Sequence, residues 1–175
     1  ALTSVYDFER SRKVSAYTTY VFDVSVSEFF VPLLRGGELH LFLEEIRHDV
    51  EALADYIIQE EIAYLYLPPA LLAQLPRQAY PHLAVIIYAG EPCDPAVAAY
   101  WSQHYRLYNY YGPTEATIYA TGRQIKGGDT HLIGRPISNV SAYVLDSQLK
   151  VLPMGAVGEL YIGGEGIARG YLNNP

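Results

Sequence analysis

Short apolar runs that alternate with segments of helical period are the feature that most constrains this chain. Five short strands are expected, at 14–20, 38–43, 63–67, 85–87 and 106–110; the first is rich in β-branched and aromatic residues. Strands that alternate with helices form right-handed crossovers and an open, mostly parallel sheet. The pattern therefore predicts an α/β fold, and ligands of such sheets bind outside the carboxyl ends of the strands.

The intervening segments carry helix signals. In the clearest amphipathic helix, apolar residues recur at the helical period at Val50, Leu53, Ala54, Ile57 and Ile58. Asp94 and Pro95 have the residue types of an N-cap and first turn, which predicts a helix through Gln103. A shorter helix is expected at 70–75, directly after two prolines.

Another helix is expected to begin beside Asp23. Ser25 and Glu28 have the spacing of a capping box, in which each side chain bonds the backbone of the other residue. Gly36 and Gly37 follow as a stop signal. An acidic residue at the start of a helix is also favoured by the helix dipole alone, so Asp23 has a structural as well as a functional interpretation.

Four features should share the edge of the sheet where the strands end. They are Asp23, Tyr66, the segment 89–91 and the segment 109–115. This shared position follows from the parallel strand order alone.

The segment at the end of the fifth run combines several reactive groups. Its residues are Asn109, Tyr110, Tyr111, Gly112, Pro113, Thr114 and Glu115. The Gly-Pro pair predicts a turn, because Gly tolerates positive φ and Pro fixes its own φ. The turn presents an aromatic ring, a hydroxyl and a carboxylate, the groups that stack a base, bond a phosphate and hold a divalent cation. An ordinary turn with a solvated Glu is the alternative.

The pattern changes after about residue 130. Strands are expected at 141–146 and 158–163, separated by a turn at 153–155, with no helical period between them. We therefore predict an α/β subdomain over residues 1–130 and the start of an all-β subdomain over residues 131–175.

Charge and composition exclude several classes of partner. The 175 residues carry a formal net charge of −7, which opposes binding to a nucleic-acid backbone. No apolar run reaches the roughly 18 residues of a membrane span, and no secretory signal is visible. The single Cys93 fits a reducing, cytoplasmic compartment. The five His residues are dispersed, which argues against a metal cluster.

Three segments resemble the adenylation domains of nonribosomal peptide synthetases, within the adenylate-forming superfamily. They are Phe22 to Ser25 with Glu28 and Phe29, then Asn109 to Glu115, then Gly158 to Leu172. The resemblance implies a flavodoxin-like sheet with flanking helices, followed by the first strands of a β-barrel subdomain. It also implies a ligase that forms an aminoacyl-adenylate from ATP. The enzyme would load the acyl group on the phosphopantetheine thiol of a carrier domain, beside a condensation domain.

The resemblance also indicates which family segments are missing from these 175 residues. The family has a Gly/Ser/Thr-rich phosphate loop upstream of the Phe-Asp motif. Downstream it has a Thr-Gly-Asp segment, a hinge and a small subdomain with a catalytic Lys. The chain is therefore expected to be a central fragment that does not catalyse adenylation alone.

By resemblance, the nucleotide site comprises Gly90, Glu91, Asn109, Tyr111, Gly112 and Thr114. Tyr111 would stack on adenine, Thr114 would bond the α-phosphate and Glu115 would hold Mg²⁺, so Thr114 and Glu115 are the expected catalytic pair. The structural alternatives are a packed aromatic for Tyr111, a solvated acid for Glu115 and a plain strand-end turn for 90–91.

By resemblance, the amino-acid pocket comprises Asp23, Val24, Ser27, Tyr66, Ile87, Ala89, Tyr110, Ile118 and Tyr119. Asp23 would pair with the α-ammonium group of the substrate. Small side chains at 27 and 89 leave depth, and three phenols surround it. We expect an extended aromatic or guanidinium-bearing amino acid, since Tyr faces stack on either. Alternatively, the three rings fill the pocket and admit only a small side chain.

Other functional classes stay open. The chain can be an isolated subdomain that binds substrate without catalysis, or a fragment of an acyl- or aryl-CoA ligase. The α/β pattern alone also permits a flavin-binding electron-transfer domain.

Overall fold

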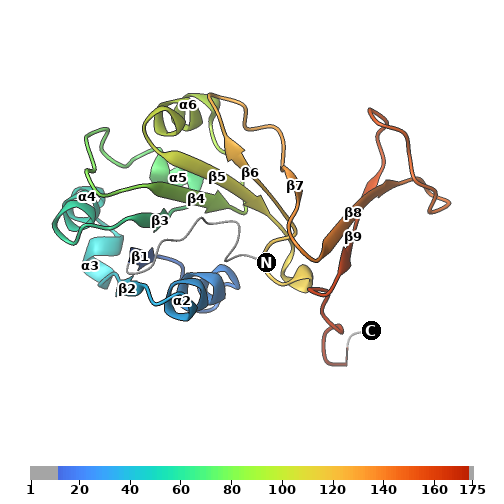
Figure 1. The fold of residues 1–175 in the computed structure, drawn as a ribbon, viewed down its shortest axis with the longest axis horizontal. Helices are drawn as coiled ribbons and strands as arrows, with labels where there is room; N and C mark the ends of the chain where they lie inside the picture. The colour runs from blue at the N-terminus through green and yellow to red at the C-terminus, as the bar shows by residue number, and fades with distance from the viewer. Residues whose placement is uncertain (1–11, 174–175) are drawn as a thin grey trace.

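The computed structural model describes residues 12–173, which form a seven-stranded sheet and a separate two-stranded sheet (Figure 1). The order in the large sheet is β2-β1-β3-β4-β5-β6-β7. The first five strands pair in parallel, whereas β6 and β7 add to the edge in antiparallel pairs. The strands are β1 (Lys13–Ala16), β2 (Glu38–Leu41), β3 (Tyr64–Tyr66), β4 (Val85–Ala89), β5 (Arg106–Tyr111), β6 (Thr121–Ile125) and β7 (Arg135–Pro136).

Helices cover both faces of the large sheet. They are α2 (Val24–Leu34), α3 (Glu44–Arg47), α4 (Val50–Gln59), α5 (Pro69–Leu72) and α6 (Pro95–His104), with a 3-10 turn η1 (Thr114–Ala116). Side chains of α4, α5 and α6 pack with β3, β4 and β5 in the larger core. Side chains of α2 pack on the opposite face (Figure 1). Strand β4 is buried along its whole length, as expected for a parallel strand covered on both sides.

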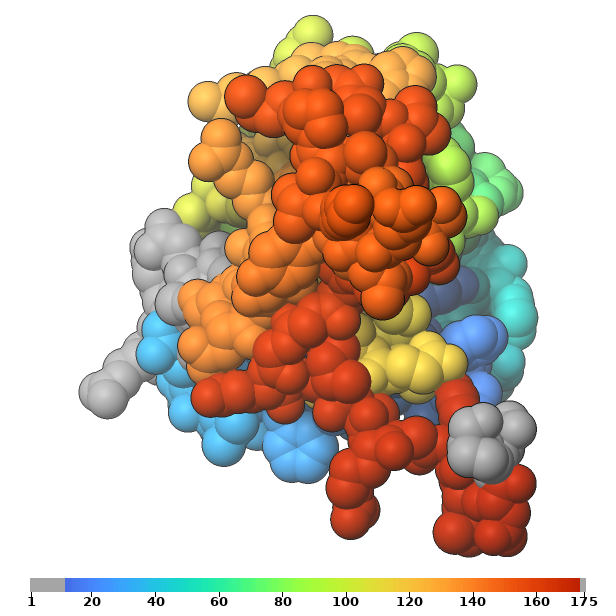
Figure 2. Space-filling view, turned by 90° about the vertical axis from the view of Figure 1, so that its right-hand side faces the viewer, coloured from blue at the N-terminus to red at the C-terminus, as the bar shows by residue number. Residues whose placement is uncertain are grey.

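The second sheet projects from the end of the chain (Figure 1). It consists of β8 (Val140–Leu145) and β9 (Glu159–Gly164) in an antiparallel pair. Figure 2 shows this pair and the segment after β9 on the face beside η1. Strand β7 precedes the pair in the chain but belongs to the large sheet.

The predicted α/β class with a mostly parallel sheet is confirmed. Helices were expected at the positions of α4 and α6, and both begin with the side chain of an Asp that accepts backbone N–H bonds, Asp49 and Asp94. Strand β1 ends at Ala16 rather than at Tyr20. The short helix α3 carries no periodic pattern of its own and was not predicted.

The predicted capping box at Ser25 and Glu28 is wrong. The hydroxyl of Ser25 donates to the carbonyl oxygen of Phe22, at 2.7 Å. The carboxylate of Glu28 accepts from the backbone N–H groups of Tyr17 and Thr18 instead. The box fails because these donors, which lie 11 and 10 residues upstream, take the carboxylate.

None of the helices between residues 12 and 173 combines the length and apolar character that a membrane crossing needs. Within the same residues, no group of three or more His, Cys, Asp or Glu side chains is placed to hold a metal ion.

Candidate functional site

A cleft of about 640 Å³ opens where the parallel strands of the large sheet end. It collects residues from β3, β4, the start of α2 and the segment after β5, which are far apart in the sequence. Of the predicted site residues it is lined by Asp23, Val24, Tyr66, Ala89, Gly90, Glu91, Tyr111, Gly112, Thr114, Ile118 and Tyr119. The structure thus brings together the four features that strand order predicted at one edge.

Part of the lining of the cleft lies at the ends of strands β3 and β4. Strand β3 ends at Tyr66, and Pro68 with Pro69 then opens α5. Strand β4 ends at Ala89, and Gly90 follows with φ +86°. A Cβ atom at Gly90 would meet nothing within 4 Å, so the reason for Gly at this position is its left-handed backbone. The Glu91 carboxylate accepts from the N–H of Ala70, at 3.4 Å, beside α5.

Gly112 is required because of close backbone contacts, not because of the positive φ that the Gly-Pro pair suggested. Its φ is not positive, but an added Cβ would lie 2.6 Å from the backbone nitrogen of Ala120 and 2.6 Å from the carbonyl oxygen of Ile118. The N–H of Ala120 also donates to the carbonyl oxygen of Tyr111, at 2.8 Å. The loop therefore folds back on itself so closely that only Gly fits.

Where this loop turns back toward β6, two β-branched residues have a left-handed backbone conformation. Thr117 has φ 59° and Ile118 has φ 72°. Such a conformation costs on the order of 1–3 kcal/mol for each residue and is found where the surrounding structure enforces it, often at functional sites. This strained pair turns Ile118 into the cleft, and no sequence pattern signalled it.

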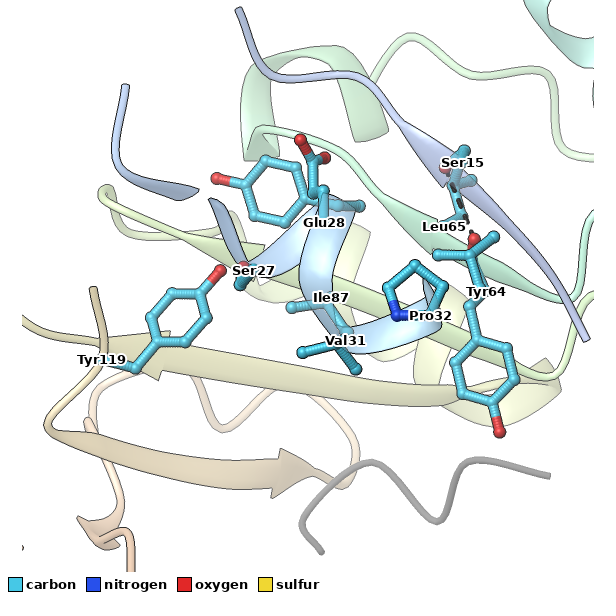
Figure 3. A pocket seen from close by; sticks show the side chains of 11 residues that line it. Ser15, Ser27, Glu28, Val31, Pro32, Tyr64, Leu65, Ile87 and Tyr119 are labelled. Atoms are coloured by element: carbon cyan, nitrogen blue, oxygen red, sulfur yellow. Dashed lines mark hydrogen bonds between the residues drawn. The ribbon is translucent and has the colours of Figure 1, made fainter. Parts of the chain in front are cut away.

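A smaller cavity, of about 30 Å³, lies between α2 and the sheet. It is lined by the predicted residues Ser27 and Ile87, and it shares Tyr66 and Tyr119 with the cleft. Figure 3 shows the hydroxyl of Tyr119 directed toward Ser27. The Ser27 hydroxyl donates to the carbonyl oxygen of Val24, at 2.8 Å. The two predicted residues thus lie beneath the cleft.

The phenols of the site are held neutral. Burial, together with nearby carboxylates, raises the pKa of Tyr66 well above its usual range. Burial also raises the pKa of Tyr119 and of Tyr110. Tyr110 does not line the cleft: it is buried, and its ring packs against that of Tyr119, with ring centroids 4.9 Å apart. Two neutral phenols, Tyr66 and Tyr119, therefore line both the cleft and the smaller cavity.

Asn109 of the predicted nucleotide site and the predicted Mg²⁺ ligand Glu115 lie outside the cleft. Asn109 is buried on β5, where its amide donates to the carbonyl oxygen of Leu132 at 3.5 Å. Glu115 lines a neighbouring hollow between η1 and β9. The hydroxyl of Tyr171 donates to the Glu115 carboxylate at 3.0 Å, which raises the pKa of Tyr171.

One wall of the cleft was not predicted from the sequence. Tyr17, Thr18 and Thr19 line it directly after β1, together with Arg47 from α3. The guanidinium carbon of Arg47 lies 5.1 Å from the centre of the Tyr17 ring. The first three could have been found from their place after a parallel strand, whereas Arg47 sits on the helix that no pattern predicted.

Several known proteins are similar to this chain in sequence. The family model described as AMP-binding enzyme matches residues 1–172. The chain is 37% identical over its full length to bacitracin synthase 3 from Bacillus licheniformis, of which it spans 3%. Tyrocidine synthase 1 from Brevibacillus parabrevis is 35% identical over 93% of the chain, which spans 15% of that protein.

Solved structures show the same fold. One is a holo four-domain nonribosomal peptide synthetase bound to AMP and glycine, with a TM-score of 0.89, 32% identity and coverage of 99% of this chain and 14% of that one. Another is the NpsA N-terminal subdomain from Klebsiella oxytoca in complex with 3-hydroxyanthranilyl-AMSN. Its TM-score is 0.82 at 21% identity, over 98% of this chain and 46% of that one, a likeness of fold alone.

Proposed function

Because this chain belongs to the family of AMP-binding enzymes, we propose that it is part of an amino-acid-activating adenylation domain of a nonribosomal peptide synthetase. The observation that carries the proposal is the cleft at the strand ends, which gathers Asp23 and the segment 111–114 around one space. A carboxylate and a phosphate-binding loop that face one space are the arrangement that joining an amino acid to a nucleotide requires.

In this proposal Asp23 binds the α-ammonium group of the amino acid. Asp23 stands at the N-cap of α2, yet its side chain caps no N–H group of the helix. Its carboxylate is half-buried on the cleft wall, where it is available to a cation. A charge-assisted bond to an ammonium group is stronger than a neutral one, which suits an anchor for the substrate.

In this proposal the nucleotide lies along the wall formed by the ends of β4 and β5 and the segments that follow them. Tyr111 is 39% exposed, so its ring offers a face for adenine rather than filling the core. Gly90 and Glu91 contribute backbone beside the base, and the Thr114 hydroxyl bonds the α-phosphate. These groups position the substrate carboxylate for attack on the α-phosphorus, with pyrophosphate as the leaving group. Positioning and neutralisation of phosphate charge supply the catalysis.

Glu115 fits the Mg²⁺ that such a reaction uses. Mg²⁺ in nucleotide sites is bound by one or two carboxylates together with substrate phosphates and water, not by a cage of protein ligands. A single exposed carboxylate one residue after Thr114 matches this donor set. The ion would neutralise charge on the phosphates, while Tyr171 orients the carboxylate that holds it.

The acyl group is then transferred to a phosphopantetheine thiol on a carrier domain, which we propose as a partner together with a condensation domain. We further propose an extended aromatic or guanidinium-bearing amino acid as substrate. A cleft of about 640 Å³ that is lined by the small Ala89 together with Tyr66 and Tyr119 supports this class. A panel of amino acids in ATP–pyrophosphate exchange tests it, and a strong preference for glycine or alanine would contradict it.

Replacement of Asp23 tests the proposal most directly. In an adenylation domain that contains this chain, Asp23→Ala should raise the KM for the amino acid at least about thirtyfold, because loss of one partner of a hydrogen-bonded charge pair costs about 2–5 kcal/mol. The KM for ATP should stay nearly unchanged. Asp55→Ala, which removes an exposed acid from α4, is the control. Equal effects of the two variants would refute the assignment of Asp23.

A further inference from the structure

The wall of the cleft between β1 and α2, residues 17–23, packs against the core only near its start, where the ring centroid of Tyr17 lies 6.2 Å from that of Phe42. Tyr20, Val21 and Phe22 are 84%, 70% and 65% exposed. The segment from Tyr17 to Asp23 also contains few bonds of its own, such as the one from the N–H of Phe22 to the carbonyl oxygen of Thr19 at 3.1 Å. Burial of side chains therefore does not hold residues 20–22 of this wall in place.

One buried carboxylate ties this segment to the helix that follows it. Glu28 is 5% exposed on α2. Its Oε1 accepts from the N–H of Tyr17 at 3.1 Å, and its Oε2 accepts from the N–H of Thr18 at 3.0 Å. Both oxygens are thus committed to two successive N–H groups at the start of the wall, and the tie closes a loop of 10 to 11 residues that contains Asp23.

The surroundings of Glu28 reinforce the tie. Arg47 lies over the Tyr17 ring, and the Tyr17 hydroxyl donates to the carbonyl oxygen of Arg47 at 3.2 Å. The positive charge of Arg47 favours the ionised form of Glu28, whereas burial disfavours it. Figure 3 places Glu28 beside the small cavity beneath the cleft, next to Ser27. The wall is therefore fastened from α2 and from α3.

We propose that Glu28 is a positioning residue for amino-acid recognition: it anchors the 17–23 wall to α2 and thereby fixes where Asp23 meets the substrate. This inference rests on the proposed role of Asp23. Glu28 acts through the backbone of Tyr17 and Thr18, and Tyr17, Thr18, Asp23 and Arg47 line the cleft. The nucleotide wall comes from the segments after β4 and β5, so the anchor should affect the amino acid and not ATP.

The experiment uses Glu28→Gln in an adenylation domain that contains this chain, at pH 8. Gln is nearly isosteric but has only one accepting oxygen, so one of the two N–H groups loses its partner. We expect the KM for the amino acid to rise about tenfold, which corresponds to about 1.4 kcal/mol. The KM for ATP and kcat should stay within about twofold. A general loss of structure would not raise the KM for the amino acid while leaving the KM for ATP and kcat unchanged. Glu45→Gln, which makes the same change at an exposed position of α3, is the control.

A second readout measures the anchor itself. Hydrogen exchange at the amides of Tyr17 and Thr18 should be faster in Glu28→Gln than in the wild type, while exchange within β4 stays unchanged. If Glu28→Gln does not yield folded protein, Glu28→Asp, which keeps the charge but shortens its reach, is measured in the same way.

The outcomes separate this inference from the proposed function. An unchanged amino-acid KM in Glu28→Gln, beside a raised KM in Asp23→Ala, overturns the positioning role and leaves the proposed function intact. An unchanged KM in Asp23→Ala refutes the proposed function and this inference with it. A rise in both KM values, for ATP and for the amino acid, also overturns the inference, because it indicates a structural role of Glu28.

Discussion

At the scale of single residues, close backbone approach rather than conformational freedom fixes Gly112. A methyl group there would enter the space of three backbone atoms, of Ile118, Tyr119 and Ala120. Backbone atoms cannot rotate aside, so the loop itself would have to move. The cost of forcing extra atoms into such a packed position is typically about 1–3 kcal/mol.

Gly112→Ala should therefore lower the free energy of unfolding of the adenylation domain by at least about 1–3 kcal/mol. It should also weaken ATP binding, because the displaced loop carries Tyr111 and Thr114. Gly163→Ala is a matched control, since a Cβ at Gly163 meets nothing within 4 Å and its φ is not in the positive range. Urea unfolding of both variants gives the comparison, and equal midpoints would contradict the explanation of Gly112.

At the scale of elements, local patterns predicted those features whose causes are local. The helix at α4 follows from its apolar period, and the start of α6 follows from Asp94 and Pro95. Strand order then predicted which segments share the cleft. All of these signals are contained within one element or in the alternation of neighbouring elements.

Features that depend on distant contacts were not predictable from the sequence. Glu28 was expected to cap α2, but its partners come from the end of β1. Tyr110 was expected in the pocket, but its ring is buried against that of Tyr119 and does not line the cleft. Arg47 entered the cleft from α3, a helix of four residues that is too short to show a period. For Glu28 and Tyr110 the deciding neighbour lies outside the element that carries the residue, and a linear pattern does not contain it.

The buried Glu28 on helix α2 should make the stability of the domain depend on pH. Burial raises the pKa of Glu28 from 4.5 to about 7, although the N–H bonds and Arg47 oppose the rise. The folded chain therefore holds this proton more tightly than the unfolded chain. The resulting contribution to stability is fully present below about pH 4.5 and is lost as the pH rises through about 7.

Between about pH 4.5 and pH 8, the wild-type domain should therefore lose about 3 kcal/mol of unfolding free energy relative to Glu28→Gln, which does not titrate. Urea unfolding of both proteins at several pH values measures this difference. A difference that stays constant across the range would show that Glu28 has the same affinity for protons in both states.

At the scale of the whole molecule, the two sheets are joined through the loop that follows β9. The N–H of Ala168 donates to the carbonyl oxygen of Glu115 at 2.7 Å, and the Thr117 hydroxyl donates to the carbonyl oxygen of Gly166. Tyr171 adds a bond to the Glu115 carboxylate. Figure 2 shows this loop lying against η1. The segment proposed to hold the nucleotide and Mg²⁺ is thus supported by a part of the chain 49 to 56 residues further on.

Removal of one of these hydrogen bonds should make the contact between the loop after β9 and the η1 region less stable, without unfolding either sheet. Thr117→Val keeps the β-branched shape but loses the hydroxyl, and a typical hydrogen bond contributes about 1 kcal/mol. Hydrogen exchange at the Ala168 amide should therefore become about fivefold faster, while exchange in the β8–β9 pair stays the same. Thr121→Val is the matched control, because the Thr121 hydroxyl also donates to a backbone carbonyl, that of Ile133, at 2.7 Å. Acceleration at Ala168 in the control, or its absence in Thr117→Val, would mean that the loop after β9 is held by other contacts.

Since the loop bonds both the backbone and the side chain of Glu115, the Mg²⁺ concentration for half-maximal pyrophosphate exchange should rise in Thr117→Val alone.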